Sequence, residues 1–237
     1  MRIIRAAAAA LAVALASTPC AAAPAPLLGT VEFRTASLAG LAEWQRVLRG
    51  IEDERPIYGA CLRDPGACPT PGARAWQEMI QSQTGQVAMD QLISVNRFLN
   101  NWQYKPDSEN YGRRDYWATP LEFLRLSGDC EDYAIVKYVT LRQLGYPAER
   151  LRLVVVRDTA RELAHAVLAV YLDDGVYVMD NLTSAVLPQD RVRHYVPYYS
   201  TNEASRWAHV TPLQQMAADR PRQVAPSTEA GRGTAPP

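Results

Sequence analysis

The chain is predicted to be an α+β protein in which helices come first and an antiparallel sheet follows. Up to residue 144, apolar residues recur three and four positions apart, which is typical of amphipathic helices. After residue 150 they form short continuous runs separated by turn residues, which is typical of strands. The length of 237 residues is sufficient for one domain with a sizeable core.

The first half of the chain predicts three amphipathic helices. The first is marked by apolar residues from Leu38 to Leu48, ahead of a loop that carries two cysteines. The second covers about residues 74–83, and the third has a continuous apolar stripe over residues 88–102. The simplest interpretation of these stripes is packing in the core.

Two further helices are predicted from their capping signals. Residues 119–122, Thr-Pro-Leu-Glu, form a capping box with Pro at the first helical position, and this helix stops at Gly128. Asp129 then caps a helix over residues 130–144, which ends in a Gly-Tyr-Pro stop signal. Cys130 is thereby expected in the first turn of a helix.

Three strands are predicted in the second half, at residues 151–156, 164–172 and 176–179. The turn between the last two is expected at Asp173-Asp174-Gly175.

The N-terminal segment predicts export of the protein. Residues 1–22 hold two arginines, an apolar stretch too short to span a bilayer, and small residues, which is typical of a secretory signal peptide. Residues 23–216 would then form the folded domain. Residues 217–237 would form a disordered tail, because Pro, Ala, Gly, Ser, Thr and Arg dominate there. We expect a periplasmic protein whose mature chain has no transmembrane segment.

The composition disfavours nucleic-acid binding. The chain has 25 basic and 25 acidic side chains, with 48% hydrophobic and 21% charged residues. Removal of the predicted signal peptide takes away two arginines, which leaves 23 basic and 25 acidic groups and a net charge near −2. Such a chain has no positive excess with which to hold a phosphate backbone.

Cys61 and Cys68 bracket a short loop that contains Pro and Gly. In an oxidising compartment we expect them to form a local disulfide. The alternatives are two free structural thiols or half of a metal site, although no second Cys/His cluster is available to complete tetrahedral ligation. Cys130 is left without a partner, so it is either a buried small hydrophobic residue or a reactive group.

Cys130 is the candidate nucleophile. A helix N-terminus stabilises a thiolate through its unpaired backbone N–H groups and the positive end of the helix dipole. Catalysis also needs a base, and His165 interrupts an otherwise apolar strand. Asp180, at the end of the next strand, is the candidate that orients the imidazole. The plainer interpretations are a core histidine for His165 and a strand-end or turn residue for Asp180.

The register of the two strands decides whether His165 and Asp180 can meet. A two-residue turn at Asp174-Gly175 places Asp180 opposite Ala169, which is four residues from His165 and about 13 Å away. A four-residue loop over residues 171–174 places His165 and Asp180 opposite each other. We therefore predict this wider loop or an equivalent bulge.

Three acidic residues, Asp129, Glu131 and Asp132, flank Cys130 and would raise the pKa of its thiol. Asp129 and Asp132 are explained equally well as helix caps. The alternative is a bound divalent cation, because clustered carboxylates are the hard oxygen ligands that calcium prefers. Calcium would offset the negative charge beside the thiol, with backbone carbonyls or water as further ligands.

The chain carries a distinctive series of motifs in order: WATPLEFL at 117–124, GDCEDYA at 128–134, HAVL at 165–168, MDNL at 179–182, then Tyr199-Ser200 and Trp207. This series resembles the bacterial transglutaminase-like cysteine peptidases, of which the LapG-type periplasmic proteases are members. The likeness covers about residues 44–207.

The resemblance implies a papain-like fold with helices packed on an antiparallel sheet. It implies a catalytic triad of Cys130, His165 and Asp180. It also implies calcium dependence, carried onto Asp129 and Glu131, with Asp132 as a further candidate ligand. In LapG-type systems the protease cuts the N-terminal region of a large surface adhesin, and an inner-membrane receptor for cyclic di-GMP sequesters the protease.

The expected reaction is peptide hydrolysis through a thioester on Cys130. The backbone N–H of Cys130 and the indole N–H of Trp117 are the candidate oxyanion donors. Two alternatives remain open: a transglutaminase-like acyl transferase or deamidase with the same triad, and a calcium-responsive binding module without catalysis.

Overall fold

The computed structural model describes residues 26–212. The predicted signal peptide, residues 1–22, lies outside the described residues, and so does the predicted tail, residues 217–237. The helices are α1 (Ala42–Arg63), α2 (Pro71–Gln83), α3 (Ala88–Leu99), α4 (Asp107–Asn110), α5 (Pro120–Leu126) and α6 (Cys130–Gln143). The strands are β1 (Val31–Thr35), β2 (Leu151–Asp158), β3 (Leu163–Leu172), β4 (Gly175–Met179), β5 (Leu187–Pro188), β6 (Tyr195–Thr201) and β7 (Arg206–Val210).

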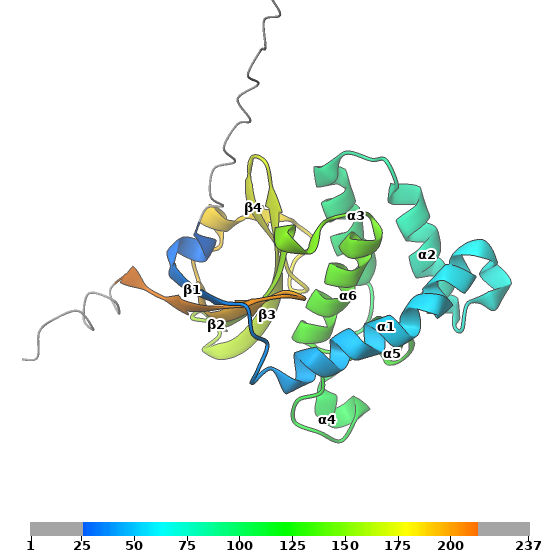
Figure 1. Ribbon diagram of the computed structural model, residues 1–237, viewed down its shortest axis with the longest axis horizontal. Coiled ribbons are helices and arrows are strands. Elements are labelled where there is room, and N and C mark those ends of the chain that lie inside the picture. The colour runs from blue at the N-terminus through cyan, green and yellow to red at the C-terminus, as the bar shows by residue number, and fades with distance from the viewer. Residues whose placement is uncertain (1–25, 213–237) are drawn as a thin grey trace, which may run out of the picture.

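The helices gather on one side of a single seven-stranded antiparallel sheet, with strand order β1-β7-β6-β2-β3-β4-β5 (Figure 1). The predicted α+β class is confirmed. Leu153, Leu168 and Met179 pack with the helices in the main core. Neighbouring residues such as Val154 and Val167 point to the opposite face and form a second apolar cluster, because side chains alternate along a strand.

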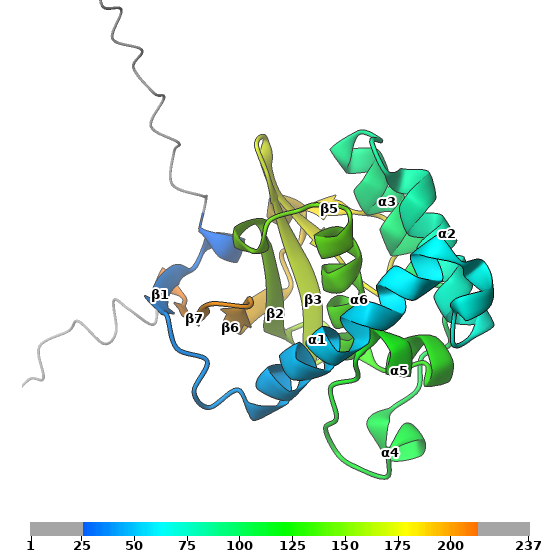
Figure 2. The ribbon, with the colours of Figure 1, turned by 45° about the vertical axis from the view of Figure 1, so that its right-hand side comes forward.

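Helix α6 lies between the sheet and the other long helices (Figure 2). Every residue from Asp132 to Leu141 is buried, which is typical of a helix enclosed on all sides. The capping box that was predicted ahead of α5 is present, with Thr119 and Glu122 as its members. Helices α5 and α6 therefore begin where the sequence predicted, and Cys130 is the first residue of α6.

Helix α1 is longer than the apolar stripe up to Leu48 predicted. Its buried face continues through Tyr58 to Cys61 in the last turn, although Pro56 lies inside the helix. Cys61 forms a disulfide with Cys68 across the short loop, as the sequence predicted. This bond ties the end of α1 to the segment that leads into α2.

The predicted wide loop between β3 and β4 is wrong. Leu172 pairs with Gly175 and Leu168 pairs with Met179, so the connection is a two-residue turn of Asp173 and Asp174. In this register Asp180 comes two residues along from His165 and on the same face. Strand β4 ends at Met179, so Asp180 lies beyond the ladder and its side chain reaches diagonally.

The strands β1, β5, β6 and β7 were not predicted. Strand β6 contains Pro197 and polar residues, and β1 pairs with β7 from the far end of the described chain.

No helix within residues 26–212 is long and apolar enough to cross a membrane.

Candidate active site

The Cys130 side chain lies partly exposed at the N-terminus of α6. Its Sγ donates a hydrogen bond to Glu131 Oε2 at 3.1 Å, and no hydrogen bond joins it to the His165 ring within the described residues. Burial raises the pKa of the Cys130 thiol, and so does the charge of Glu131. The backbone N–H of Ala166 bonds to the sulfur and acts in the opposite direction. This contact places the thiol beside the residue that follows His165.

His165 and Asp180 are in direct contact and both are buried. Nε2 of the imidazole lies 2.9 Å from Oδ1 of Asp180. The backbone N–H of Leu182 also donates to Oδ1, at 3.0 Å, and the hydroxyl of Tyr195 donates to Oδ2 at 2.6 Å. Although burial by itself raises the pKa of Asp180, the bonds from His165, Tyr195 and Leu182 lower it below the ordinary value.

Five carboxylates converge next to the thiol. Oxygens of Asp107, Asp115 and Glu131 lie within 4.8 Å of one another, and so do oxygens of Asp107, Asp129 and Asp132. Burial raises the pKa of Asp107 to about 6 and that of Glu131 to about 10, with the nearby Asp129 carboxylate as a further cause in both cases. Without a cation, this cluster therefore resists full ionisation.

Two oxygens in this cluster have no partner. Asp107 Oδ1 and Asp129 Oδ1 are buried and accept no hydrogen bond from any residue in the described range. Asp132 is different, because its Oδ1 accepts from Ala118 N at 2.6 Å and its Oδ2 from Asp129 N at 3.1 Å. The capping role considered for Asp132 is thus present in the structure.

The sequence did not single out Asp107 and Asp115. They lie in and after α4, on a segment fixed to the start of α6 by Lys105 N donating to Gly128 O at 2.9 Å. Tertiary contacts of this kind bring them to the cluster, so no local pattern indicated them. The Trp117 indole N–H donates to Asp115 Oδ1 at 3.0 Å. For the predicted role as an oxyanion donor, the Trp117 indole N–H would have to leave Asp115 and bond to the substrate oxygen instead.

Lys137 is another residue that the sequence analysis did not single out. It lies on α6, its side chain is fully buried, and its Nζ makes no hydrogen bond within residues 26–212. The ammonium lies 5.7 Å from the centre of the Tyr133 ring. Burial lowers the pKa of Lys137 to about 7, and the charge of Asp180 opposes this shift. The sequence signal that could have indicated Lys137 is that it is the one charged residue within the largely apolar run 133–141.

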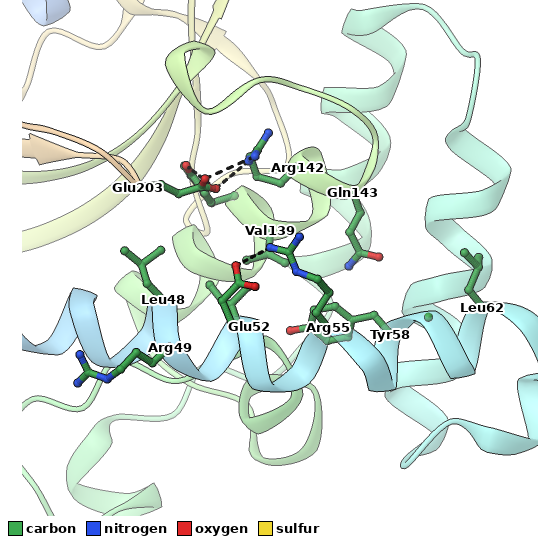
Figure 3. A pocket seen from close by; sticks show the side chains of 13 residues that line it. Leu48, Arg49, Glu52, Arg55, Tyr58, Leu62, Val139, Arg142, Gln143 and Glu203 are labelled. Carbon is green, nitrogen blue, oxygen red and sulfur yellow. Dashed lines mark hydrogen bonds and ion pairs between the residues drawn. The ribbon is translucent and has the colours of Figure 1, made fainter.

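A hollow of about 630 Å³ lies between α1 and the second half of α6 (Figure 3). Leu48 and Val139 line it, and Arg142 pairs with Glu203 at 2.7 Å on its rim. Arg142 follows Cys130 by twelve residues of the same helix, or about 18 Å. This hollow is therefore separate from the thiol.

A thiol at a helix N-terminus, beside a buried His–Asp pair on an antiparallel sheet, is typical of papain-like cysteine peptidases. The sequence model of the bacterial transglutaminase-like cysteine proteinases (BTLCP) matches residues 56–215, which is more than half of the chain. The chain belongs to this family, and it is a cysteine peptidase.

Three solved structures of LapG from Legionella pneumophila are similar to this chain. The calcium-bound form is 34% identical over 58% of this chain and 77% of its own, with a TM-score of 0.54. The EGTA-treated form is 30% identical over 65% and 86%, with a TM-score of 0.58. A third is 28% identical over 67% and 91%, with a TM-score of 0.57. A comparison with curated proteins found no match.

Proposed function

We propose that this cysteine peptidase uses Cys130 as nucleophile, His165 as general base and acid, and Asp180 to orient the imidazole. The observation that carries the proposal is the buried bond between His165 Nε2 and Asp180 Oδ1 at 2.9 Å. It fixes the tautomer and leaves Nδ1, which has no hydrogen bond within the described residues, as the atom that exchanges protons with the thiol.

The proposed reaction has two halves. Nδ1 takes the proton of Sγ as sulfur attacks the peptide carbonyl carbon, and the same proton then passes to the departing amine. The thioester that remains is hydrolysed by water, from which His165 removes a proton before the thiol is restored. The backbone N–H of Cys130 at the start of α6 is the proposed oxyanion donor, together with the Trp117 indole if it leaves Asp115.

We also propose a calcium site formed by Asp129, Glu131 and Asp132, to which the structure adds Asp107 and Asp115 as candidate ligands. The residues fit the ion, since all five offer hard oxygen atoms and two of those atoms are buried without a partner. Bound calcium would offset the carboxylate charge that raises the pKa of Cys130. A relative, LapG of Legionella pneumophila, has a calcium-bound and an EGTA-treated structure.

The proposed substrate is an exported protein, in particular the N-terminal region of a large surface adhesin. The support is the predicted signal peptide together with the family likeness. On the same grounds we propose a periplasmic location and sequestration by an inner-membrane receptor for cyclic di-GMP.

The test is incubation of the mature protein with the periplasmic and surface fractions of the cell that produces it. We expect a cleavage product in calcium that is lost in EGTA and lost with Cys130→Ala, whose circular dichroism should match the wild type. A labelled primary amine in a parallel sample separates hydrolysis from acyl transfer, because only a transferase would attach the label to the product. Cleavage by Cys130→Ala would refute the assignment of Cys130 as the nucleophile.

A further inference from the structure

A polar hollow lies directly beyond Asp180. Its volume is about 540 Å³, and it is open to solvent. One wall is formed by Arg97 at the C-terminal end of α3 and by Asn101 in the turn that follows, and the other wall is the segment 181–184. The exposed apolar residue of this rim is Leu182, whose side chain is 49% exposed.

Hydrogen bonds join the walls of this hollow to the proposed triad. Asn100 Nδ2 donates to the carbonyl oxygens of Asp180 and Thr183, both at 2.9 Å. The backbone N–H of Leu182 donates to Asp180 Oδ1 at 3.0 Å. The hollow is therefore held in a fixed position relative to the carboxylate that contacts His165.

The direction of the substrate follows from the two nitrogens of His165, and this step rests on the proposed function. Nε2 contacts Asp180, so Nδ1 on the other ring edge is the atom that meets the thiol in the proposed reaction. The carbonyl carbon of the scissile bond lies at the sulfur, and its amine lies toward the imidazole that protonates it. The substrate chain after the scissile bond accordingly leaves in the direction of Asp180 and the segment 181–184.

The distance from the Cys130 sulfur to the Asp180 carboxylate corresponds to a few residues of extended peptide. In the reacting geometry, in which Nδ1 hydrogen-bonds the thiol, the path from the sulfur across the imidazole to the Asp180 carboxylate is about 8 Å. An extended chain advances about 3.3 to 3.6 Å per residue. The hollow therefore begins about two to three residues after the scissile bond.

Arg97 gives the hollow its charge. It is the one charged residue in the lining, its side chain is exposed, and it forms no ion pair or hydrogen bond with the described residues. The remaining polar lining consists of neutral amides and hydroxyls. An acidic side chain would complement it, and a basic one would be repelled.

We propose that this hollow is the binding subsite for the leaving-group side of the substrate, and that Arg97 selects an acidic side chain two to four residues after the scissile bond. The guanidinium binds the carboxylate of the substrate at the mouth of the hollow, while Leu182 contacts the apolar part of the same segment. Arg97 is thus a specificity residue and takes no part in the chemistry.

The test uses a library of peptides derived from a whole proteome, digested by the mature protein in calcium. Sequencing the new N-termini by mass spectrometry reads the residues after each cut directly. We expect Asp and Glu to be enriched about threefold to fivefold at one of positions two to four, as for a solvent-exposed ion pair. Arg97→Glu should abolish this enrichment and favour Lys and Arg there. Arg49→Glu, an exposed arginine on α1 in the separate hollow, should leave the wild-type pattern unchanged.

The outcomes are distinct. Cleavage without any charge preference, or a preference that Arg97→Glu leaves intact, would overturn the subsite and leave the proposed function standing. No cleavage of any peptide by the wild type would count against the proposed function and the subsite together.

Discussion

Asp180 stays ionised inside the fold because three groups donate to it. They are the imidazole of His165, the backbone N–H of Leu182 and the hydroxyl of Tyr195. A buried carboxylate with these partners has its pKa held below the ordinary value, so it can stabilise a positive imidazole at neutral pH. Tyr195 therefore supports the proposed triad, although it does not contact the thiol.

Tyr195→Phe removes one donor and keeps the ring. We expect kcat/KM to fall about tenfold, because a hydrogen bond to a charged group contributes roughly 1.5 kcal/mol or more. The measurement is peptide cleavage, with Tyr198→Phe as the matched control, since Tyr198 is 51% exposed on the same strand. Equal activity of Tyr195→Phe and wild type would show that this hydroxyl does not support Asp180.

Lys137 makes the stability of the protein depend on pH. Burial lowers the pKa of Lys137 to about 7 in the folded state, whereas an unfolded lysine has a pKa of about 10.4. Between these values the unfolded state binds the additional proton, so the folded state loses stability as pH falls from about 10 to 7. The penalty is complete below pH 7 and absent above pH 10.4.

Lys137→Met should therefore stabilise the fold at low pH. We expect the free energy of unfolding in urea to rise by about 1 kcal/mol or more at pH 6, with a smaller gain at pH 9.5. Lys105→Met, at a half-buried position, is the control. A variant that is less stable than wild type at pH 6, or one whose gain is the same at both pH values, would contradict this account.

At the scale of single residues, the sequence predicted those site residues that stand in a recognisable local pattern. Cys130 follows a cap, His165 interrupts an apolar strand, and these patterns are visible within ten residues. Tyr195 and Asp107 have no such signature, because their partners lie far away in the chain.

Among the elements, the segment from α4 to α5 decides whether the carboxylates meet. Lys105 N donates to Gly128 O, and Asn110 Nδ2 donates to Ser127 O at 3.1 Å. These bonds hold Asp107 and Asp115 against the first turn of α6 before any ion binds. A site arranged in advance loses little conformational entropy on binding.

Asp107→Asn should weaken calcium binding while the fold is kept. We expect at least a tenfold rise in the Kd measured by calorimetry, since the variant removes one charged ligand. Asp53→Asn, at an exposed position on α1, is the control and should bind as the wild type does. An unchanged Kd for Asp107→Asn would remove this residue from the proposed ligand set.

Among the helices and strands, local features were predictable from the sequence and long-range pairing was not. The caps of α5 and α6 were predictable because a cap is a local hydrogen-bond pattern. The register of β3 and β4 was not, because it depends on which two residues form the turn. Strands β1 and β7 were missed because their pairing joins opposite ends of the described chain, which no local pattern shows.

For the molecule as a whole, the site lies where two layers meet. The helical layer and its connecting segments supply Cys130 and the proposed calcium ligands. The sheet supplies His165 and Tyr195, and Asp180 follows directly after β4. Helix α6 packs against β2 and β3, so the buried core between the layers sets the distance between thiol and imidazole (Figure 2). The proposed peptidase chemistry depends on this packing as much as on the residues themselves.

The central claim is that His165 promotes ionisation of Cys130, and the rate of alkylation by iodoacetamide measures it directly. Cys130 is the free cysteine of residues 26–212, so the mature protein reports on one thiol. In calcium, we predict that the rate reaches half its plateau at least about one pH unit lower in the wild type than in His165→Ala. Identical pH profiles for the two proteins would contradict the account.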